Sequence, residues 1–384
     1  MASVVETAPL VLNVGAVLLV AATSGLAARK VGLPAIVGYL ITGLLVSPFT
    51  PGLVADSNQI ALLADIGVVL LLFEVGIEID LRRIKKEQGA LLWASPLQVI
   101  LGTALCTPLF LALDISLYGS ALLALSVAMS SSVVIVNITR SRRRTTSVST
   151  EDSLLGWSVL QDVTGVALGA LIIAILGNTG DSPLQSIFGL IGFTLAAYVS
   201  SKLLPYLLRA IRWEHDLFLI YSVAFGLFIA ALGTVLFNIP MALASFVAGL
   251  AINQSRDTDD VRKAVLPFRD LFQVLFFVVI GSLVQPDLIV EALPFAAILL
   301  AAMFAFKTFP SYLFARFGKI SDSPAQLSIG LSQVGEFSFV LGSAALLAGA
   351  ITKVQFTGML LSVIASIIIS TLAVRRASRI SRSI

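Results

Sequence analysis

Long apolar segments separated by short polar connections follow one another along the whole chain. Each is about twenty residues long, the length that an α-helix needs to cross the hydrocarbon core of a bilayer. The period-two alternation typical of barrel strands is absent from the sequence. The pattern therefore predicts an all-α membrane protein with thirteen transmembrane helices, at residues 8–28, 33–48, 59–79, 88–112, 117–139, 153–177, 184–208, 215–236, 240–254, 266–285, 290–315, 324–349 and 355–374.

Positive charge is distributed unevenly between the connections. Of the 25 Lys and Arg residues, 22 fall in alternate connections or in the C-terminal tail, beginning with Arg29 and Lys30 after the first span. Basic residues concentrate on the cytoplasmic side of membrane proteins. This distribution predicts a multi-pass protein of the cell membrane with its N-terminus outside and its C-terminus in the cytoplasm.

The sequence contains an internal repeat. Residues 33–44 and 239–250 each have a proline near the start and Gly-Leu nine and ten residues after it, and residues 71–81 and 275–288 share a second pattern. The matches predict one transport unit made of a first repeat at 1–183, a linker helix at 184–212 and a second repeat at 213–384. Because an odd number of spans separates the repeats, they are inverted, as in many secondary transporters.

Polar residues interrupt the fifth and twelfth spans near their middle. The fifth span contains Ser130, Ser131 and Ser132, and the twelfth contains Gln333 and Glu336 around a glycine. These residues predict two interrupted helices whose free backbone groups and half-helix dipoles meet ions. Close packing of two continuous helices through small residues is the alternative.

The sixth span contains Gln161 and Asp162 at mid-depth. A carboxylate there is costly unless water, a partner or a cation meets it, and such residues mark ion or proton paths. Oxygen ligands suit a hard monovalent cation. We therefore expect K⁺ or Na⁺ to compete with a proton at Asp162, with Gln161 and the serines of the fifth span as further ligands. A purely structural carboxylate is the alternative.

Three ionisable residues within apolar segments are further candidates for the site. Lys307 is too far from the cytoplasmic end of the eleventh span to reach it easily, so it must meet a buried carboxylate, with Glu336 as one candidate, or the negative C-terminal ends of the interrupted helices. We expect Lys307 and Glu336, together with Gln333, to support the ion site. Glu74 in the third span is a further candidate, as part of an access path.

Composition excludes several other classes of protein. The chain is 58% hydrophobic and 12% charged, with a mean hydropathy of +0.99. It has one cysteine and no Cys/His spacing of the kind that binds metals. The net charge of +3 comes from the connections between spans and not from a nucleic-acid-binding surface. Without a nucleophile–base pair or a cofactor motif, we expect neither an enzyme nor a cofactor.

Several motifs resemble those of Kef-type potassium/proton antiporters, in the second family of monovalent cation/proton antiporters. They are Gly32-Leu-Pro-Ala-Ile-Val-Gly-Tyr-Leu-Ile-Thr-Gly43, Gly67-Val-Val-Leu-Leu-Leu-Phe73, Phe246-Val-Ala-Gly-Leu250, Gln333-Val-Gly-Glu-Phe-Ser-Phe339 and the pair Gln161-Asp162. The resemblance implies a homodimer with a dimerisation domain and a six-helix core in which the fifth and twelfth spans cross. It assigns cation and proton binding to Asp162, and it makes Lys307 the buried lysine near that site.

The chain departs from this family in two respects. Kef proteins continue into a cytoplasmic nucleotide-binding regulatory domain, whereas this chain stops soon after the last span without a glycine-rich fingerprint. We expect that domain to be missing or separate. Glu74 occupies a position expected to be apolar or neutral in the family.

Three functions follow as hypotheses. The first is K⁺/H⁺ exchange by alternating access, which the uncharged Gln161 favours over Na⁺/H⁺ exchange on the same fold. The second is a Na⁺-coupled symporter for an organic anion, for which Lys307 is the one candidate that the spans offer. The third is a cation channel, but the sequence contains no repeated carbonyl filter of the potassium-channel kind.

Overall fold

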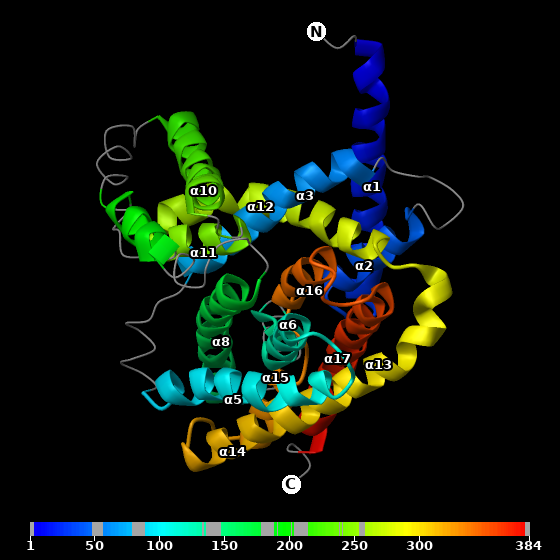
Figure 1. Ribbon diagram of the computed structural model, residues 1–384, viewed down its shortest axis with the longest axis vertical. Helices are drawn as coiled ribbons and strands as arrows, with labels where there is room; N and C mark the ends of the chain where they lie inside the picture. The colour runs from blue at the N-terminus through cyan, green and yellow to red at the C-terminus, as the bar shows by residue number, and fades with distance from the viewer. Residues whose placement is uncertain are drawn as a thin grey trace. The chain divides into compact units, whose positions relative to one another are not determined.

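The structure is a computed structural model that describes residues 4–47, 57–78, 89–132, 134–135, 147–177, 188–189, 191–200, 202, 214–237, 239, 241–252 and 258–380. Within these residues every regular element is a helix and there is no strand (Figure 1). In this part of the chain seven helices are long and apolar enough to cross a membrane, and five apolar helices are shorter. The predicted all-helical multi-pass protein is confirmed, and the count of thirteen spans stays a prediction.

The chain divides into two compact units. The first unit combines Met1–Ile79 with Thr179–Pro286, and the second combines Asp80–Asn178 with Asp287–Ile384. Each unit therefore takes one segment from the N-terminal half of the sequence and one from the C-terminal half.

The first unit packs its helices around α3. In this unit α3 lies against α11 and α12, and α2 lies against α1 and α12. The helix bounds are α1 Val4–Lys30, α2 Ala35–Leu45, α3 Ser57–Glu78, α10 His215–Phe237, α11 Met241–Ile252 and α12 Thr258–Ser282.

Two pairs of glycines bring helix backbones of the first unit into contact. A Cβ atom on Gly43 would lie 2.1 Å from the carbonyl oxygen of Val278 and 2.7 Å from the Cα of Gly281. A Cβ on Gly249 would lie 2.1 Å from the carbonyl oxygen of Phe73 and 3.0 Å from the Cα of Gly76. Only glycine permits this approach, so α2 meets α12 and α11 meets α3 through their main chains.

Helix α12 begins earlier than its apolar segment predicts. The predicted span starts at residue 266, whereas the helix starts at Thr258 and has Asp259 and Asp260 in its first turn. Acidic side chains stabilise a helix N-terminus. Arg262, which the sequence places in a connection, also forms an ion pair with Glu74 of α3. The extra turns are therefore amphipathic and packed.

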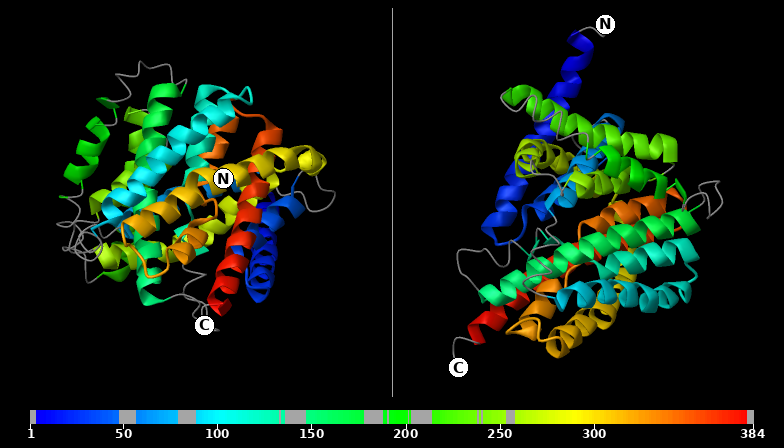
Figure 2. Two further views of the ribbon diagram at one scale, coloured as in Figure 1. Left: turned by 90° about the horizontal axis from the view of Figure 1, so that it is seen from below. Right: turned by 90° about the vertical axis from the view of Figure 1, so that its left-hand side faces the viewer.

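The second unit contains both predicted interruptions. Helices α5, α6 and α8 pack side by side, and α15 packs against α8, α14 and α17 (Figure 2). One long helix, formed by α13, a π-helical turn and α14, runs without a break. A short 3₁₀ helix at Pro286–Leu288 precedes α13. The bounds are α5 Leu91–Leu111, α6 Leu117–Ala128, α8 Val148–Leu176, α13 Ile289–Met303, the π-helix Phe304–Thr308, α14 Phe309–Phe317, α15 Pro324–Leu331, α16 Phe337–Leu347 and α17 Lys353–Ile380.

Serine caps begin three helices of the second unit. The side chains of Ser116, Ser147 and Ser323 each accept a hydrogen bond from the backbone N–H three residues later, at 3.2, 3.2 and 3.4 Å. Each bond satisfies one of the N–H groups that a helix start leaves free. The sequence thus fixes where α6, α8 and α15 start.

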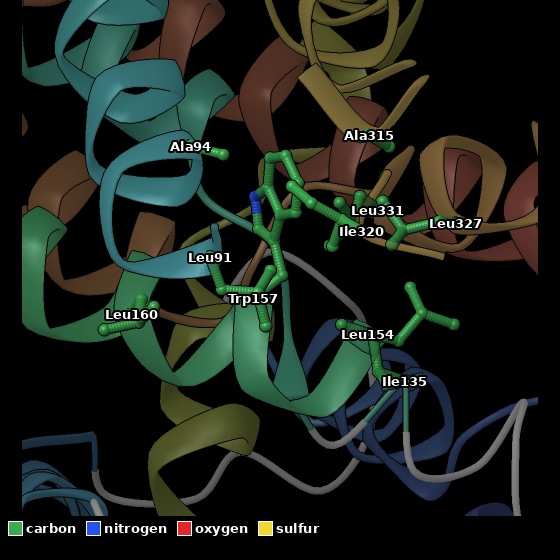
Figure 3. Close-up of a cluster of buried hydrophobic side chains, with 10 residues drawn as sticks. All are labelled: Leu91, Ala94, Ile135, Leu154, Trp157, Leu160, Ala315, Ile320, Leu327 and Leu331. Atoms are coloured by element: carbon green, nitrogen blue, oxygen red, sulfur yellow. The ribbon is translucent and has the colours of Figure 1, made fainter. Parts of the chain in front are cut away.

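An apolar cluster centred on Trp157 holds α8 in place (Figure 3). The Trp157 side chain is fully buried, and the hydroxyl of Ser95 on α5 donates to its backbone carbonyl at 2.8 Å. The cluster joins side chains from α5, α8, α14 and α15, so it fixes the position of the α8 turn that follows it. Its buried members are Leu91, Ala94, Ile135, Leu154, Trp157, Leu160, Ala315, Ile320, Leu327 and Leu331.

Candidate functional site

Both predicted interruptions are confirmed. Helix α6 ends at Ala128, the backbone of Met129 is extended, and helical backbone resumes at Ser132. In the second case α15 ends at Leu331 and α16 starts at Phe337. The alternative of two continuous helices packed through small residues is therefore wrong.

The two interruptions are bonded directly to each other. The backbone N–H of Ser131 donates to the side-chain oxygen of Gln333 at 2.9 Å, and the side-chain nitrogen of Gln333 donates to the Ser131 carbonyl at 3.1 Å. The Ser130 hydroxyl donates to the Leu331 carbonyl at 2.8 Å, and the Gly335 N–H donates to the Met129 carbonyl at 3.0 Å. The interruptions thereby satisfy each other's buried backbone groups.

Gly335 allows the two interruptions to come this close. A Cβ atom there would lie 2.8 Å from both the carbonyl carbon and the oxygen of Ser130. Val334 beside it donates its N–H to the hydroxyl of Ser366 on α17 at 3.0 Å. The second interruption is therefore held on both sides.

Lys307 links the two interrupted helices. It is fully buried on the π-helical turn, and its ammonium donates to the Met129 carbonyl at 3.0 Å and to the Gln333 carbonyl at 2.7 Å. These carbonyls follow the C-terminal ends of α6 and α15, where helix dipoles concentrate negative charge. Among the described residues Lys307 forms no ion pair. Of the two partners that the sequence leaves open, the helix ends are confirmed.

Gln161 and Asp162 lie on α8 beside the end of α6. Gln161 is fully buried, and its side-chain nitrogen donates to the Gln98 side-chain oxygen and, at 3.4 Å, to the Ala128 carbonyl. Its own oxygen is buried and accepts no hydrogen bond from the described residues. Asp162 is half-buried, and one turn later a Cβ on Gly165 would lie 2.3 Å from the Met129 sulfur. This turn of α8 therefore runs along the first interruption.

The remaining candidates divide between the two units. Ser130 and Ser131 are buried, while Ser132 and Glu336 are half-buried at the ends of the interruptions. Glu74 belongs to the first unit, whereas every other candidate belongs to the second.

Glu74 has basic partners within its own unit. It is 1% exposed, and its carboxylate accepts from the Arg262 Nε at 2.7 Å and from an Arg269 guanidinium nitrogen at 2.6 Å. The negative charge is therefore paired twice, which explains how it is tolerated at this depth.

Gln98 is not among the residues that the sequence predicts for the site. It is fully buried on α5 and contacts both Gln161 and Trp157. One signal was available, because Gln98 is an isolated amide in an otherwise apolar predicted span.

The polar groups at the interruptions are mainly oxygens. The described residues contain no group of three or more His, Cys, Asp or Glu side chains that could hold a metal ion. The candidate residues instead offer the carboxylates of Asp162 and Glu336, an amide oxygen, hydroxyls and backbone carbonyls. Hard oxygen ligands of this kind suit a cation such as K⁺ or Na⁺ passing through as substrate.

Comparisons with known proteins agree with this geometry. The chain is 28% identical over 384 residues to the putative cation/proton antiporter YbaL of Escherichia coli, covering 93% of this chain and 68% of the relative. Two structures of the sodium proton antiporter MjNhaP1 from Methanocaldococcus jannaschii share its fold. Their TM-scores are 0.64 and 0.60 at 16% identity, covering 95% and 96% of this chain and 96% and 93% of theirs.

A family model that covers nearly the whole chain identifies its family. The model described as "Sodium/hydrogen exchanger, transmembrane" matches residues 15–378, which is nearly the whole sequence. The chain therefore belongs to the sodium/hydrogen exchanger family of transmembrane cation/proton antiporters.

Proposed function

We propose that this chain exchanges K⁺ for H⁺ across the cell membrane, with the two ions competing at Asp162. One observation carries the proposal: the side-chain oxygen of Gln161, the residue before Asp162, is buried without a hydrogen-bond partner among the described residues. A buried carbonyl oxygen without a donor is destabilising. A dehydrated cation held by Asp162 would supply the missing contact. The serines Ser130, Ser131 and Ser132 offer further oxygens at the same interruption.

Potassium is the preferred substrate in this proposal. The carboxylate has an amide for its neighbour, so the pair carries one negative charge and not two. A lower charge density favours the larger, more weakly hydrated ion. Na⁺/H⁺ exchange is the alternative, and it has the support of the sodium/hydrogen exchanger fold.

The charge balance favours electroneutral exchange. In this proposal Lys307 keeps its proton, and its ammonium holds the interrupted helices together through two hydrogen bonds to carbonyl oxygens. Asp162 then carries either one K⁺ or one proton. If Lys307 instead released its proton when the cation binds, exchange would be electrogenic.

Alternating access would use the inverted repeat of the thirteen predicted spans. The glycine contacts of the first unit support that repeat. The sequence pairs Gly43 with Gly249 and Gly76 with Gly281, and the contact of Gly43 with Gly281 has its counterpart in that of Gly249 with Gly76. A two-fold repeat relates one contact to the other. We infer a homodimer with the N-terminus outside and the C-terminus in the cytoplasm.

Proton flux in proteoliposomes tests the proposal. Liposomes holding the protein and an imposed pH gradient receive K⁺, Na⁺ or choline, and a pH-sensitive dye reports the internal pH. We expect K⁺ to dissipate the gradient at lower concentrations than Na⁺, and choline to have no effect. Competition also requires the half-saturating K⁺ concentration to rise as the pH falls, by up to about tenfold per unit.

Two substitutions on α8 provide the matched comparison. Asp162→Asn removes the proposed site and should abolish exchange, whereas Asp152→Asn changes an exposed carboxylate on the same helix and should not. Exchange that survives Asp162→Asn would contradict competition of the two ions at Asp162. A preference for Na⁺ would move the assignment to the alternative substrate.

A further inference from the structure

A chain of three side chains leads from the core of the second unit to the proposed cation site. Gln98 of α5 lies between Trp157 and Gln161 of α8, and all three side chains are fully buried. The Gln98 side-chain oxygen accepts from the Trp157 indole N–H at 3.5 Å and from the Gln161 side-chain nitrogen. Its nitrogen donates to the Ala128 carbonyl at 3.2 Å.

The outer partners of this chain have fixed polarity. An indole N–H only donates and a backbone carbonyl only accepts, whereas a glutamine amide can turn over and exchange its oxygen for its nitrogen. Trp157 therefore holds the oxygen end of Gln98, and Ala128 holds its nitrogen end. The orientation of the Gln98 amide follows from these two neighbours.

The orientation of Gln161 follows in turn. Its nitrogen has two acceptors, the Gln98 oxygen and the Ala128 carbonyl at 3.4 Å. If the amide turned over, its oxygen would face both of these oxygen atoms and repel them. The Gln161 oxygen is therefore the end left without a partner among the described residues. The hydrogen bonds of the Gln161 nitrogen therefore fix the position of this oxygen.

We propose that Gln98 and Trp157 are positioning residues that set the affinity and the K⁺/Na⁺ selectivity of this site by holding the oxygen of Gln161 toward the ion. This inference rests on the proposed function. The competing explanation is that the two residues only complete the hydrogen bonds at the end of α6. That explanation predicts lower stability without a change in cation affinity.

The experiment compares three variants in the proteoliposome assay. Gln98→Met keeps the volume and removes both ends of the amide, so we expect the half-saturating K⁺ concentration to rise about tenfold, the loss of roughly one hydrogen bond. Trp157→Phe keeps an aromatic ring and removes only the N–H, so a rise of about threefold is expected. In both variants the maximal rate should change less than twofold, and the K⁺/Na⁺ selectivity should fall.

Ser95→Ala is the matched control. Ser95 is equally buried on α5 and bonds to the backbone of Trp157, but no hydrogen bond joins it to either glutamine. Its half-saturating K⁺ concentration should stay within about twofold of the wild type. The thermal shift that K⁺ causes in detergent provides a second measure of binding that does not require transport, by linkage.

The outcomes separate this inference from the proposed function. The inference is overturned if Gln98→Met and Trp157→Phe leave both K⁺ affinity and selectivity unchanged, or if Ser95→Ala shifts them equally. If Gln98→Met does not fold, Trp157→Phe decides alone. Exchange that survives Asp162→Asn would instead remove the proposed site itself, and this inference with it.

Discussion

Ser131 and Gln333 exchange two hydrogen bonds at 2.9 and 3.1 Å, although they lie 202 positions apart in the sequence. A single side chain therefore pairs with the backbone in the manner of a neighbouring strand. It satisfies the Ser131 N–H, which the end of α6 leaves outside any helix, and gives the Ser131 carbonyl a second donor beside the Ile135 N–H at 3.1 Å. The two interruptions are thus held together by a polar contact and not only by packing.

Replacement of Gln333 by leucine should destabilise the protein. The substitution leaves the Ser131 N–H buried without its partner, at a cost of about 1–3 kcal/mol. The Ser131 carbonyl loses one donor but keeps its bond from the Ile135 N–H. Thermal unfolding in detergent should show a lower Tm. Gln326→Leu, on α15 and only half-buried, is the control and should change the Tm far less. Equal Tm shifts for the two variants would show that the bonds between Gln333 and Ser131 do not stabilise the protein.

The stability of Lys307 variants should depend on how many hydrogen-bond donors the new side chain supplies. Lys307→Leu removes both bonds to the interruption carbonyls, whereas Lys307→Gln retains one donating group. We expect unfolding to be easier by about 1–3 kcal/mol for leucine and by roughly half of that for glutamine. Lys353→Gln, at an exposed position, is the control. A leucine variant as stable as the wild type would show that the desolvation cost of the lysine outweighs its bonds.

The same lysine decides the stoichiometry. If it keeps its proton, the rate of K⁺/H⁺ exchange should not respond to a membrane potential imposed with a thiocyanate gradient. A rate that follows the potential would indicate electrogenic exchange with proton release from Lys307.

Gly335→Ala should disrupt the contact between the interruptions. The new Cβ would lie 2.8 Å from backbone atoms of Ser130, which cannot move aside as a flexible side chain does. Overpacking of this kind costs about 1–3 kcal/mol. Gly89→Ala, whose Cβ would meet nothing within 4 Å, is the control. Gly335→Ala should have a lower Tm and a lower maximal transport rate than Gly89→Ala.

Glu74→Gln tests the charged cluster of the first unit. The substitution weakens the bonds to Arg262 and Arg269, and because both arginines retain solvent contact we expect a loss of about 1–3 kcal/mol of stability. Asp270→Asn, which removes a carboxylate 62% exposed, should have little effect. The half-saturating K⁺ concentration should stay unchanged in both variants. A large rise in the half-saturating K⁺ concentration of Glu74→Gln would indicate that Glu74 is part of the access path, as its position in the sequence predicts.

Sequence alone predicted the chemistry of the second unit better than its geometry. Hydroxyls, a glycine and a carboxylate in apolar segments indicated the interruptions, because a membrane helix tolerates such residues only where something satisfies its backbone. The burial of Lys307 followed from its distance to the end of its span. Its choice of carbonyls over a carboxylate did not follow, since that depends on which segments meet in space.

Two further features lie beyond sequence patterns. A single glutamine such as Gln98 creates no periodicity in the sequence. Its role depends entirely on the residues that it contacts on other helices. The early start of α12 was missed because Arg262 reads as a loop residue until Glu74 is known to face it. Hydropathy also does not reveal that Glu74 belongs to a different unit from Asp162.

The π-helical turn at Phe304–Thr308 gives Lys307 its direction. Such a turn holds one residue more than the α-helical turn that it replaces, so everything after it is rotated by about 100° relative to a regular helix. Removal of one residue from this segment would keep the lysine in the sequence and turn it away from the Met129 and Gln333 carbonyls. The place of this charge therefore depends on a residue count as much as on a residue type.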